Sequence, residues 1–208
     1  MIHRIINTPD ATIYIWHITE TASELASILS PNKSLAMVGI DENLQIKLLH
    51  HTHFLSTRIL LFNYAHLNSP ILKNEYGKPF HIQKHISITH SNNYAAVIVS
   101  DNKSVAIDLE RIDNRILRVG HKFLSDHEMF FPEDQNVIYT TLIWSAKETL
   151  YKLYSENEVI FKEELLIHPF NYSTAGTFIG DILKPPHLLN IEIQYFTFDN
   201  YVLTWCKQ

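Results

Sequence analysis

The sequence predicts an α+β fold, in which short, mainly antiparallel strands and two long helices are spread over both halves of the chain. Apolar and polar residues alternate over several short segments, and apolar residues recur at helical spacing over two longer ones. Only five glycines are present, and they are scattered, so the sequence contains neither a P-loop nor a GxGxxG turn. The common nucleotide-binding folds therefore lose support.

Length and composition limit the classes of protein that fit. The chain has 208 residues, of which 46% are hydrophobic and 19% charged, as expected of a globular protein with one domain or two small lobes. Its net charge of −5 argues against a general DNA-binding protein and leaves small-molecule binding open. No apolar run approaches the roughly 20 residues that a membrane-spanning helix needs. We expect no membrane segment.

The cysteine content and the first residues bear on the cellular compartment. Cys206 is the single cysteine, which excludes an intramolecular disulfide, and the start "MIHRIINTPDATIYIW" lacks the apolar region of a signal peptide. We therefore expect a cytoplasmic protein. Cys206 ends the strand-like segment "YVLTWC", where a small buried side chain is expected rather than a nucleophile.

The first third of the chain predicts a strand followed by helices. "TIYIWHI", residues 12–18, alternates like a strand, and "ETASELASILSP" reads as a short helix that Pro31 stops. A single long helix is predicted from Asp41 to Leu67 by apolar residues at helical spacing, namely Leu44, Leu48, Leu55, Ile59 and Phe62.

Three histidines within this predicted helix raise the question of a zinc site. His50, His51 and His53 lie in "HHTH", but no acidic or cysteine partner stands at a recognised ligand spacing. We interpret them as surface histidines.

The rest of the chain predicts loops, strands and a second long helix. "NSPILKNEYGKPFHIQKH" is typical of a loop, with Gly77 suited to the positive φ of a tight turn. "ISITHS", "YAAVIVS" and "SVAIDLE" predict an antiparallel meander, whose last two strands are joined by the turn "DNK". Short helical pieces around "HKFLSDHEMFF" precede the helix "QNVIYTTLIWSAKETLYKLYSE", which ends near residue 156, and "IEIQYFTF" and "YVLTWC" are strand-like.

Two carboxylates stand close together in "SVAIDLERID". In a strand, Val105, Ile107 and Leu109 would face one side, and Asp108 and Glu110 would face the other. One interpretation is the solvent-exposed face of an antiparallel sheet, where acids cost little. The other is a metal site, because two carboxylates at i and i+2 repel each other and a hard divalent cation would relieve that repulsion.

The second long helix presents a similar choice. Its apolar stripe is formed by Ile143, Ala146, Leu150 and Leu153. Trp144, Glu148 and Lys152 follow each other at intervals of four on nearly the opposite side. This face is either an exposed Glu-to-Lys pair beside a half-buried tryptophan, or the lining of a cleft.

Four motifs in series carry a resemblance to a known family. "GKP" at 77–79, "ISITHS" at 86–91, "VAIDLE" at 105–110 and "WSAKETLYK" at 144–152 occur in this order. Together they resemble the 4′-phosphopantetheinyl transferases, specifically the larger surfactin-type enzymes. The resemblance implies two similar α/β lobes related by a pseudo-twofold axis, each a helix packed on a small antiparallel sheet. Their expected ranges are 1–100 and 101–208, with the metal-binding carboxylates in the second lobe and the active site between the two.

The resemblance also implies an activity. The enzyme would move the phosphopantetheine arm of coenzyme A onto a serine of an apo acyl or peptidyl carrier protein, releasing adenosine 3′,5′-bisphosphate. It implies Mg²⁺ held by Asp108, Glu110 and Glu148, and catalytic roles for Glu148, Lys152 and His90. The implied coenzyme contacts are Arg58, Lys78, His90, Ser91 and Lys152. We expect a monomer that binds neither nucleic acid nor membrane.

The chemistry of the residues agrees with this assignment. Attack on a pyrophosphate requires negative charge to be neutralised at the phosphoryl oxygens, which carboxylate-held Mg²⁺ and the Lys152 ammonium would do. The serine proton needs an acceptor, for which Glu148 and a metal-bound water are candidates, and we favour Glu148. For Arg58 the match to the family is loose, and an ordinary solvated helix arginine is the alternative.

Two other functions remain open at this point. A different Mg²⁺-dependent phosphoryl or pyrophosphate hydrolase would use the same three acids with water as the nucleophile. A non-catalytic coenzyme-binding protein is a third interpretation, but it leaves three acids without a purpose. Release of adenosine 3′,5′-bisphosphate only in the presence of an apo carrier protein would separate transfer from hydrolysis.

Overall fold

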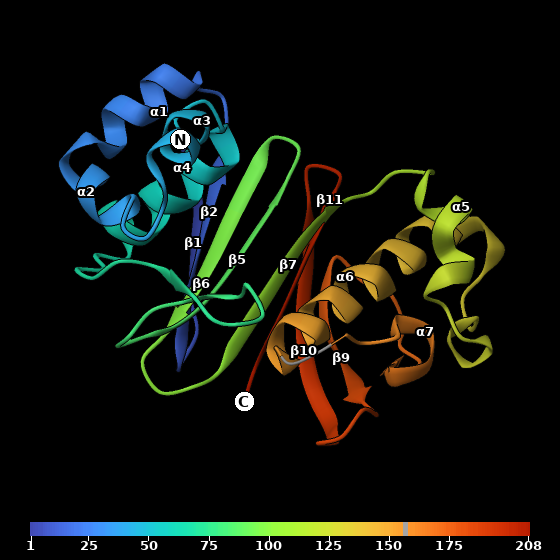
Figure 1. The fold of residues 1–208 in the computed structure, drawn as a ribbon. Coiled ribbons are helices and arrows are strands. Elements are labelled where there is room, and N and C mark those ends of the chain that lie inside the picture. Colours follow the sequence, from blue (N-terminus) through green and yellow to red (C-terminus); the bar gives the residue numbers. More distant parts are fainter. Residues whose placement is uncertain (156–157) are drawn as a thin grey trace. The chain divides into compact units, whose positions relative to one another are not determined.

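The structure is a computed structural model that describes residues 1–155 and 158–208 (Figure 1). It shows the predicted mixture of helices and antiparallel sheets. The chain divides into two compact units, Met1–Val105 and Ala106–Gln208. We describe each unit by itself, as unit 1 and unit 2.

Unit 1 is built on a four-stranded antiparallel sheet with the strand order β1-β2-β6-β5. Its strands are β1 (Ile2–Asn7), β2 (Ala11–His17), β5 (His85–Ser91) and β6 (Tyr94–Ser100). The predictions for β2, β5 and β6 are confirmed, whereas β1 was not predicted. In the two inner strands Ile13 pairs with Ile98, and both are fully buried.

The first helices of unit 1 follow the local signals in the sequence. Helix α1 (Ala22–Leu29) begins with a capping box, in which the side chains of Thr21 and Glu24 each accept a hydrogen bond from the backbone N–H of the other residue. A 3₁₀ turn, η1 (Ser30–Asn32), contains Pro31, and a short helix, α2 (Lys33–Ala36), follows. The predicted end of the helix at Pro31 is confirmed.

The single helix predicted from Asp41 to Leu67 is wrong. The structure has α3 (Glu42–Leu48), α4 (Thr52–Ile59) and a π-helical turn, η2 (Leu60–Tyr64). Between α3 and α4 the chain makes tight i−3 hydrogen bonds at His50 and His51, and His51 is extended, with φ −99° and ψ 100°. The apolar residues do not form one continuous stripe, because no residue of α3 is buried whereas α4 and η2 lie in the core.

The segment between η2 and β5 has the predicted loop character. It contains only the two-residue strands β3 (Leu72–Lys73) and β4 (Pro79–Phe80). Gly77 has φ +79°, which confirms the predicted tight turn. The apolar core of unit 1 joins helices to the sheet and includes Trp16, Leu25, Leu55, Ile59, Leu60 and Val97.

Unit 2 is built on a five-stranded sheet with the order β7-β11-β10-β9-β8. Its strands are β7 (Val105–Arg111), β8 (Leu165–Ile167), β9 (Ala175–Ile182), β10 (Leu188–Phe198) and β11 (Tyr201–Lys207). The strands predicted at β7, β10 and β11 are confirmed, and β8 and β9 were not predicted. Cys206 on β11 is buried, as expected.

The predicted three-strand meander is wrong in its last strand. β5 and β6 form an antiparallel pair, but β7 belongs to the second sheet, where its neighbour is β11. A turn signal such as "DNK" reports only the local change of chain direction. The pairing of β7 depends on a strand almost a hundred residues later, which local alternation cannot reveal.

The second long helix, α6 (Asn136–Tyr154), is confirmed, and its predicted end at residue 156 lies outside the described residues. Its stripe of Ile143, Ala146, Leu150 and Leu153 lies in the core of unit 2. Gly180 on β9 lets the helix approach closely, since a Cβ there would lie 3.0 Å from Leu150 Cδ1.

Short helical elements surround α6, and those near residues 120–128 confirm the predicted helical pieces. They are α5 (Ile116–Val119), η3 (Gly120–Lys122), η4 (Asp126–Glu128), η5 (Glu133–Gln135) and α7 (Phe161–Glu164). In the part of the chain that the structure describes, no helix is both long and apolar enough to cross a membrane.

Candidate active site

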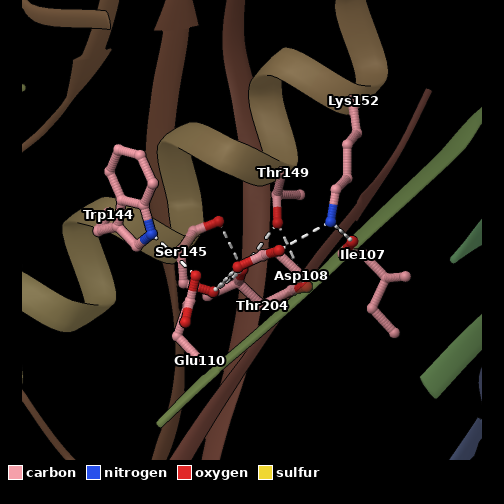
Figure 2. Close-up of polar contacts among 8 residues, drawn as sticks. All are labelled: Ile107, Asp108, Glu110, Trp144, Ser145, Thr149, Lys152 and Thr204. Atoms are coloured by element: carbon pink, nitrogen blue, oxygen red, sulfur yellow. Dashed lines mark hydrogen bonds and ion pairs between the residues drawn. The ribbon is translucent and has the colours of Figure 1, made fainter. Parts of the chain in front are cut away.

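The predicted carboxylates Asp108 and Glu110 lie on β7 (Figure 2). Glu148 lies on α6, and both elements belong to unit 2 (Figure 1). β7 is buried on both faces from Val105 to Leu109, and Asp108 is only 4% exposed. The interpretation of Asp108 as an acid on a solvated sheet face is therefore wrong. A carboxylate at this depth needs specific partners, because burial without them is costly.

Asp108 is held by two side chains of α6, as Figure 2 shows. The Lys152 ammonium donates to its Oδ1 at 2.7 Å, and the Ser145 hydroxyl donates to its Oδ2 at 2.9 Å. Lys152 also donates to the carbonyl oxygen of Ile107 at 3.1 Å. Lys152 therefore joins the end of α6 to β7 and offsets one negative charge.

Buried hydroxyl groups connect the same helix to β11. Thr204 Oγ1 donates to the Ser145 carbonyl at 3.0 Å and lies 2.7 Å from Thr149 Oγ1. The hydroxyls of Ser145 and Thr204 are 2.9 Å apart (Figure 2). This network fixes Ser145 and with it the orientation of Asp108. Sequence reasoning missed these residues, although Ser145 and Thr149 are polar residues four apart on the helix, which is a recognisable signal.

Glu110 is oriented by Trp144, which lies on α6. The indole Nε1 donates to Glu110 Oε1 at 2.9 Å. Burial and, after it, the charge of Asp108 raise the pKa of Glu110 to about 7, against the opposite effects of Trp144 and Lys152.

Glu148 belongs to the same electrostatic cluster. Its side chain is half-buried. Burial and, after it, the charges of Asp108 and Glu110 raise its pKa to about 7, against the opposite effect of Lys152. The carboxyl groups of Asp108, Glu110 and Glu148 therefore lie close enough to interact with one another and with the Lys152 ammonium group. A carboxyl whose pKa lies near neutrality is suited to accept or deliver a proton.

The donor set fits a hard divalent cation in its chemistry. Asp108, Glu110 and Glu148 offer only oxygen ligands, and their mutual repulsion is what such a cation would relieve. Within residues 1–155 and 158–208, however, no three acidic, histidine or cysteine side chains are already arranged around a metal position. Ser145 and Lys152 each donate a hydrogen bond to one of the two Asp108 oxygens, so both side chains would lie next to a cation bound by this carboxylate.

The predicted coenzyme contact Arg58 lies on α4 of unit 1 and is buried. Its guanidinium carbon lies 4.6 Å from the centre of the Phe54 ring, and its Nε has no hydrogen-bond partner in the described part of the chain. Burial lowers the pKa of Arg58 to about 10. The alternative of an ordinary solvated helix arginine is therefore wrong.

The other predicted coenzyme contacts of unit 1 lie at the ends of strands. Lys78 precedes β4, and its backbone N–H donates to Asn74 Oδ1 at 2.9 Å. His90 and Ser91 end β5, where the exposed His90 ring stacks on His53 with 4.4 Å between ring centres. His53 also lies 2.6 Å from the Asn92 carbonyl oxygen.

The structure thus brings together Asp108, Glu110, Glu148 and Lys152 in unit 2. Arg58, Lys78, His90 and Ser91 belong to unit 1. The two other histidines of "HHTH", His50 and His51, are exposed, as expected.

Sequence reasoning also missed an ion pair between Lys147 and Glu128. Its Nζ–Oε2 distance is 2.8 Å, and both side chains are fully buried. Burial lowers the pKa of Lys147, and the charge of Glu128 opposes that shift. A lysine next to Glu148 on a helix gives no signal of burial in the sequence, because lysine is rarely buried.

Comparisons with known proteins agree on one activity. Residues 104–206 match the family model of the 4′-phosphopantetheinyl transferase superfamily. A protein of Aneurinibacillus migulanus named 4′-phosphopantetheinyl transferase gsp is 31% identical over 99 residues. That match spans 45% of this chain and 41% of the length of the relative. The segment that contains β7, α6 and β11, residues 104–206, is therefore a domain of the 4′-phosphopantetheinyl transferase superfamily.

Proposed function

We propose that the protein transfers the 4′-phosphopantetheine arm of coenzyme A to a serine hydroxyl of an apo acyl or peptidyl carrier protein. The observation that carries this proposal is the cluster of Asp108, Glu110, Glu148 and Lys152, which lies inside the segment that belongs to the superfamily. The name of the relative from Aneurinibacillus migulanus supports the same activity.

We further propose that the enzyme is of the larger, surfactin-type class, with two related lobes in one chain. The sheet orders of the two units support this. In unit 1, β2 is followed by helices and by the hairpin β5–β6, and β6 lies beside β2. In unit 2, β7 is followed by α6 and later by the hairpin β10–β11, and β11 lies beside β7. Both units thus repeat one order of elements.

The proposed reaction is a displacement at phosphorus. The serine Oγ forms a bond to the phosphorus that carries the pantetheine arm, and the P–O bond to the adenosine side of the pyrophosphate breaks. The serine proton goes to Glu148, and adenosine 3′,5′-bisphosphate leaves. Without a metal ion the pKa of Glu148 is about 7, which is near the working pH at which a general base is effective.

The remaining predicted residues would bind the substrate and a metal. Lys152, whose side chain is 25% exposed, would place positive charge near the pyrophosphate. Asp108, Glu110 and Glu148 would hold Mg²⁺, which when bound neutralises negative charge on phosphoryl oxygens. We also propose that coenzyme A is held by Arg58, Lys78, His90 and Ser91.

The experiment is incubation of the protein with coenzyme A, MgCl₂ and several apo carrier proteins, followed by intact-mass measurement of each carrier. We expect one carrier at least to gain the mass of a single phosphopantetheine group. A matched carrier with its acceptor serine replaced by alanine should gain none. Cleavage of coenzyme A with no mass gain on any carrier would instead favour the hydrolase. Absence of both would contradict the proposal.

A further inference from the structure

The buried ion pair of unit 2 has every polar group satisfied. The Lys147 ammonium donates to Glu128 Oε2 at 2.8 Å, to the Phe123 carbonyl at 2.7 Å and to the Phe161 carbonyl at 2.9 Å. These three bonds use all three ammonium protons. Lys147 is fully buried, so it cannot contact a substrate.

Glu128 extends the same network to two further segments. Its Oε2 accepts hydrogen bonds from the backbone N–H and the hydroxyl of Ser125, at 2.8 and 2.9 Å. Its Oε1 accepts from the backbone N–H of Ile167 on β8 at 2.9 Å. The ion pair therefore ties α6 to η4, to β8 and to the backbone at residues 123 and 161.

The two residues whose carbonyls bind Lys147 also pack against Trp144. The ring of Phe123 lies 4.9 Å from that of Trp144, and the ring of Phe161 lies 5.4 Å from it. Trp144 precedes Lys147 by three residues on α6 and donates its indole N–H to Glu110. One cluster thus connects the ion pair to a carboxylate of the candidate active site.

We propose that the Lys147–Glu128 ion pair is a positioning device, which fixes Phe123 and Phe161 against Trp144 and thereby orients the Glu110 carboxylate. Its effect on catalysis rests on the proposed transferase function, whereas its effect on Trp144 does not. An apolar pair would fill the same space but would not direct hydrogen bonds onto the two carbonyls. Buried ion pairs add little stability over apolar residues, so a role in fixing geometry is the better reason for this one.

The test uses the double variant Lys147→Met/Glu128→Gln, which removes both charges and leaves neither partner buried alone. Acrylamide quenching of fluorescence reports the exposure of Trp144, and subtraction of the emission of Trp144→Phe isolates its signal. The control is Asp181→Asn, which removes a charge from a different pair of unit 2, in which His168 Nε2 lies 2.7 Å from Asp181 Oδ2. That pair has no hydrogen bond to Lys147 or Glu128 among the described residues.

Two changes are expected in the double variant. Quenching of Trp144 should increase in the absence of metal, because the rings no longer hold the indole. The Mg²⁺ concentration for half-maximal transfer should rise about tenfold, as for loss of a group that orients a metal ligand, while the KM for the carrier protein stays unchanged. Asp181→Asn should change neither quantity.

A folded double variant with wild-type quenching and wild-type Mg²⁺ dependence would overturn the proposal and leave the pair a purely structural feature. Should the double variant not fold, Glu128→Gln takes its place, because it removes the charge that holds the Lys147 ammonium and keeps the size of the side chain. The same two changes are expected there, and unchanged values would again overturn the proposal. A wild-type protein without transfer activity would contradict the proposed function, but the quenching experiment would still test the positioning of Trp144.

Discussion

Replacement of Glu148 by glutamine should change how the stability of the protein depends on pH. Burial raises the pKa of Glu148 from 4.5 to about 7 in the folded protein. The folded state therefore holds this proton more tightly than the unfolded chain does. As the pH rises from about 4.5 through about 7, ionisation of Glu148 costs stability, and above that range the full cost is present. Glutamine cannot ionise, so the variant should escape this cost.

The magnitude follows from the size of the shift. A rise from 4.5 to about 7 corresponds to about 3 kcal/mol, at about 1.4 kcal/mol for each pH unit. For a chain of 150–250 residues, 1 kcal/mol moves the melting temperature by roughly 2–4 °C, so the expected difference at pH 8 is roughly 6–12 °C. At pH 5 the wild-type carboxyl is largely protonated, and the two proteins should melt at nearly the same temperature.

The assay is thermal unfolding of metal-free protein from pH 5 to pH 8. The wild type and Glu148→Gln are compared at each pH, so that titration of other groups, such as the buried His81 with its lowered pKa, cancels in the difference. Glu163→Gln, at an exposed position on α7, is the matched control and should follow the wild type. A constant difference in melting temperature between wild type and Glu148→Gln from pH 5 to pH 8 would refute the placement of Glu148 in a desolvated carboxylate cluster.

Three further predictions concern activity and coenzyme A binding. Glu148→Gln should lower the rate of transfer to a carrier by about 10²–10⁴-fold at saturating Mg²⁺, as loss of a general base does, and a variant that keeps a tenth of the wild-type rate would contradict this. Trp144→Phe should raise the Mg²⁺ concentration for half-maximal transfer by about 10–100-fold, because Glu110 loses its donor, and an unchanged titration would contradict it. Arg58→Met should weaken coenzyme A binding, measured by calorimetry, and unchanged affinity would contradict the proposed contact. It should not lower the melting temperature, because it removes a buried guanidinium whose Nε has no partner among the described residues.

The elements that sequence reasoning predicted correctly are those with a strong local signal. The period of α6 is regular over five turns, β2 and β5 alternate, and β6 is a short, continuous apolar run. The break between α3 and α4 was missed, because apolar residues at helical spacing occur on both sides of His51 and nothing local shows that α3 is exposed. The partner of β7 was missed because strand pairing is a long-range property.

The residues of the candidate site were predicted from the sequence, whereas their burial and their contacts were not. Asp108, Glu110, Glu148 and Lys152 were predicted, because acids and a lysine at these spacings match a motif. The depth of Asp108 and its bond to Ser145 depend on how α6 packs against β7 and β11, which the sequence does not encode locally. The burial of Lys147 and Glu128 was unpredictable for the same reason, since the groups that bind Lys147, and the Ile167 N–H that binds Glu128, are 14 to 39 residues away.

The central claim is that this protein transfers the phosphopantetheine arm of coenzyme A rather than hydrolysing its pyrophosphate. The most direct measurement is the amount of adenosine 3′,5′-bisphosphate released, compared with the amount of carrier protein modified in the same reaction. We expect equal amounts, and we expect release to stop when the carrier is omitted or its acceptor serine is replaced. Release that continues without the carrier would contradict transfer and indicate hydrolysis.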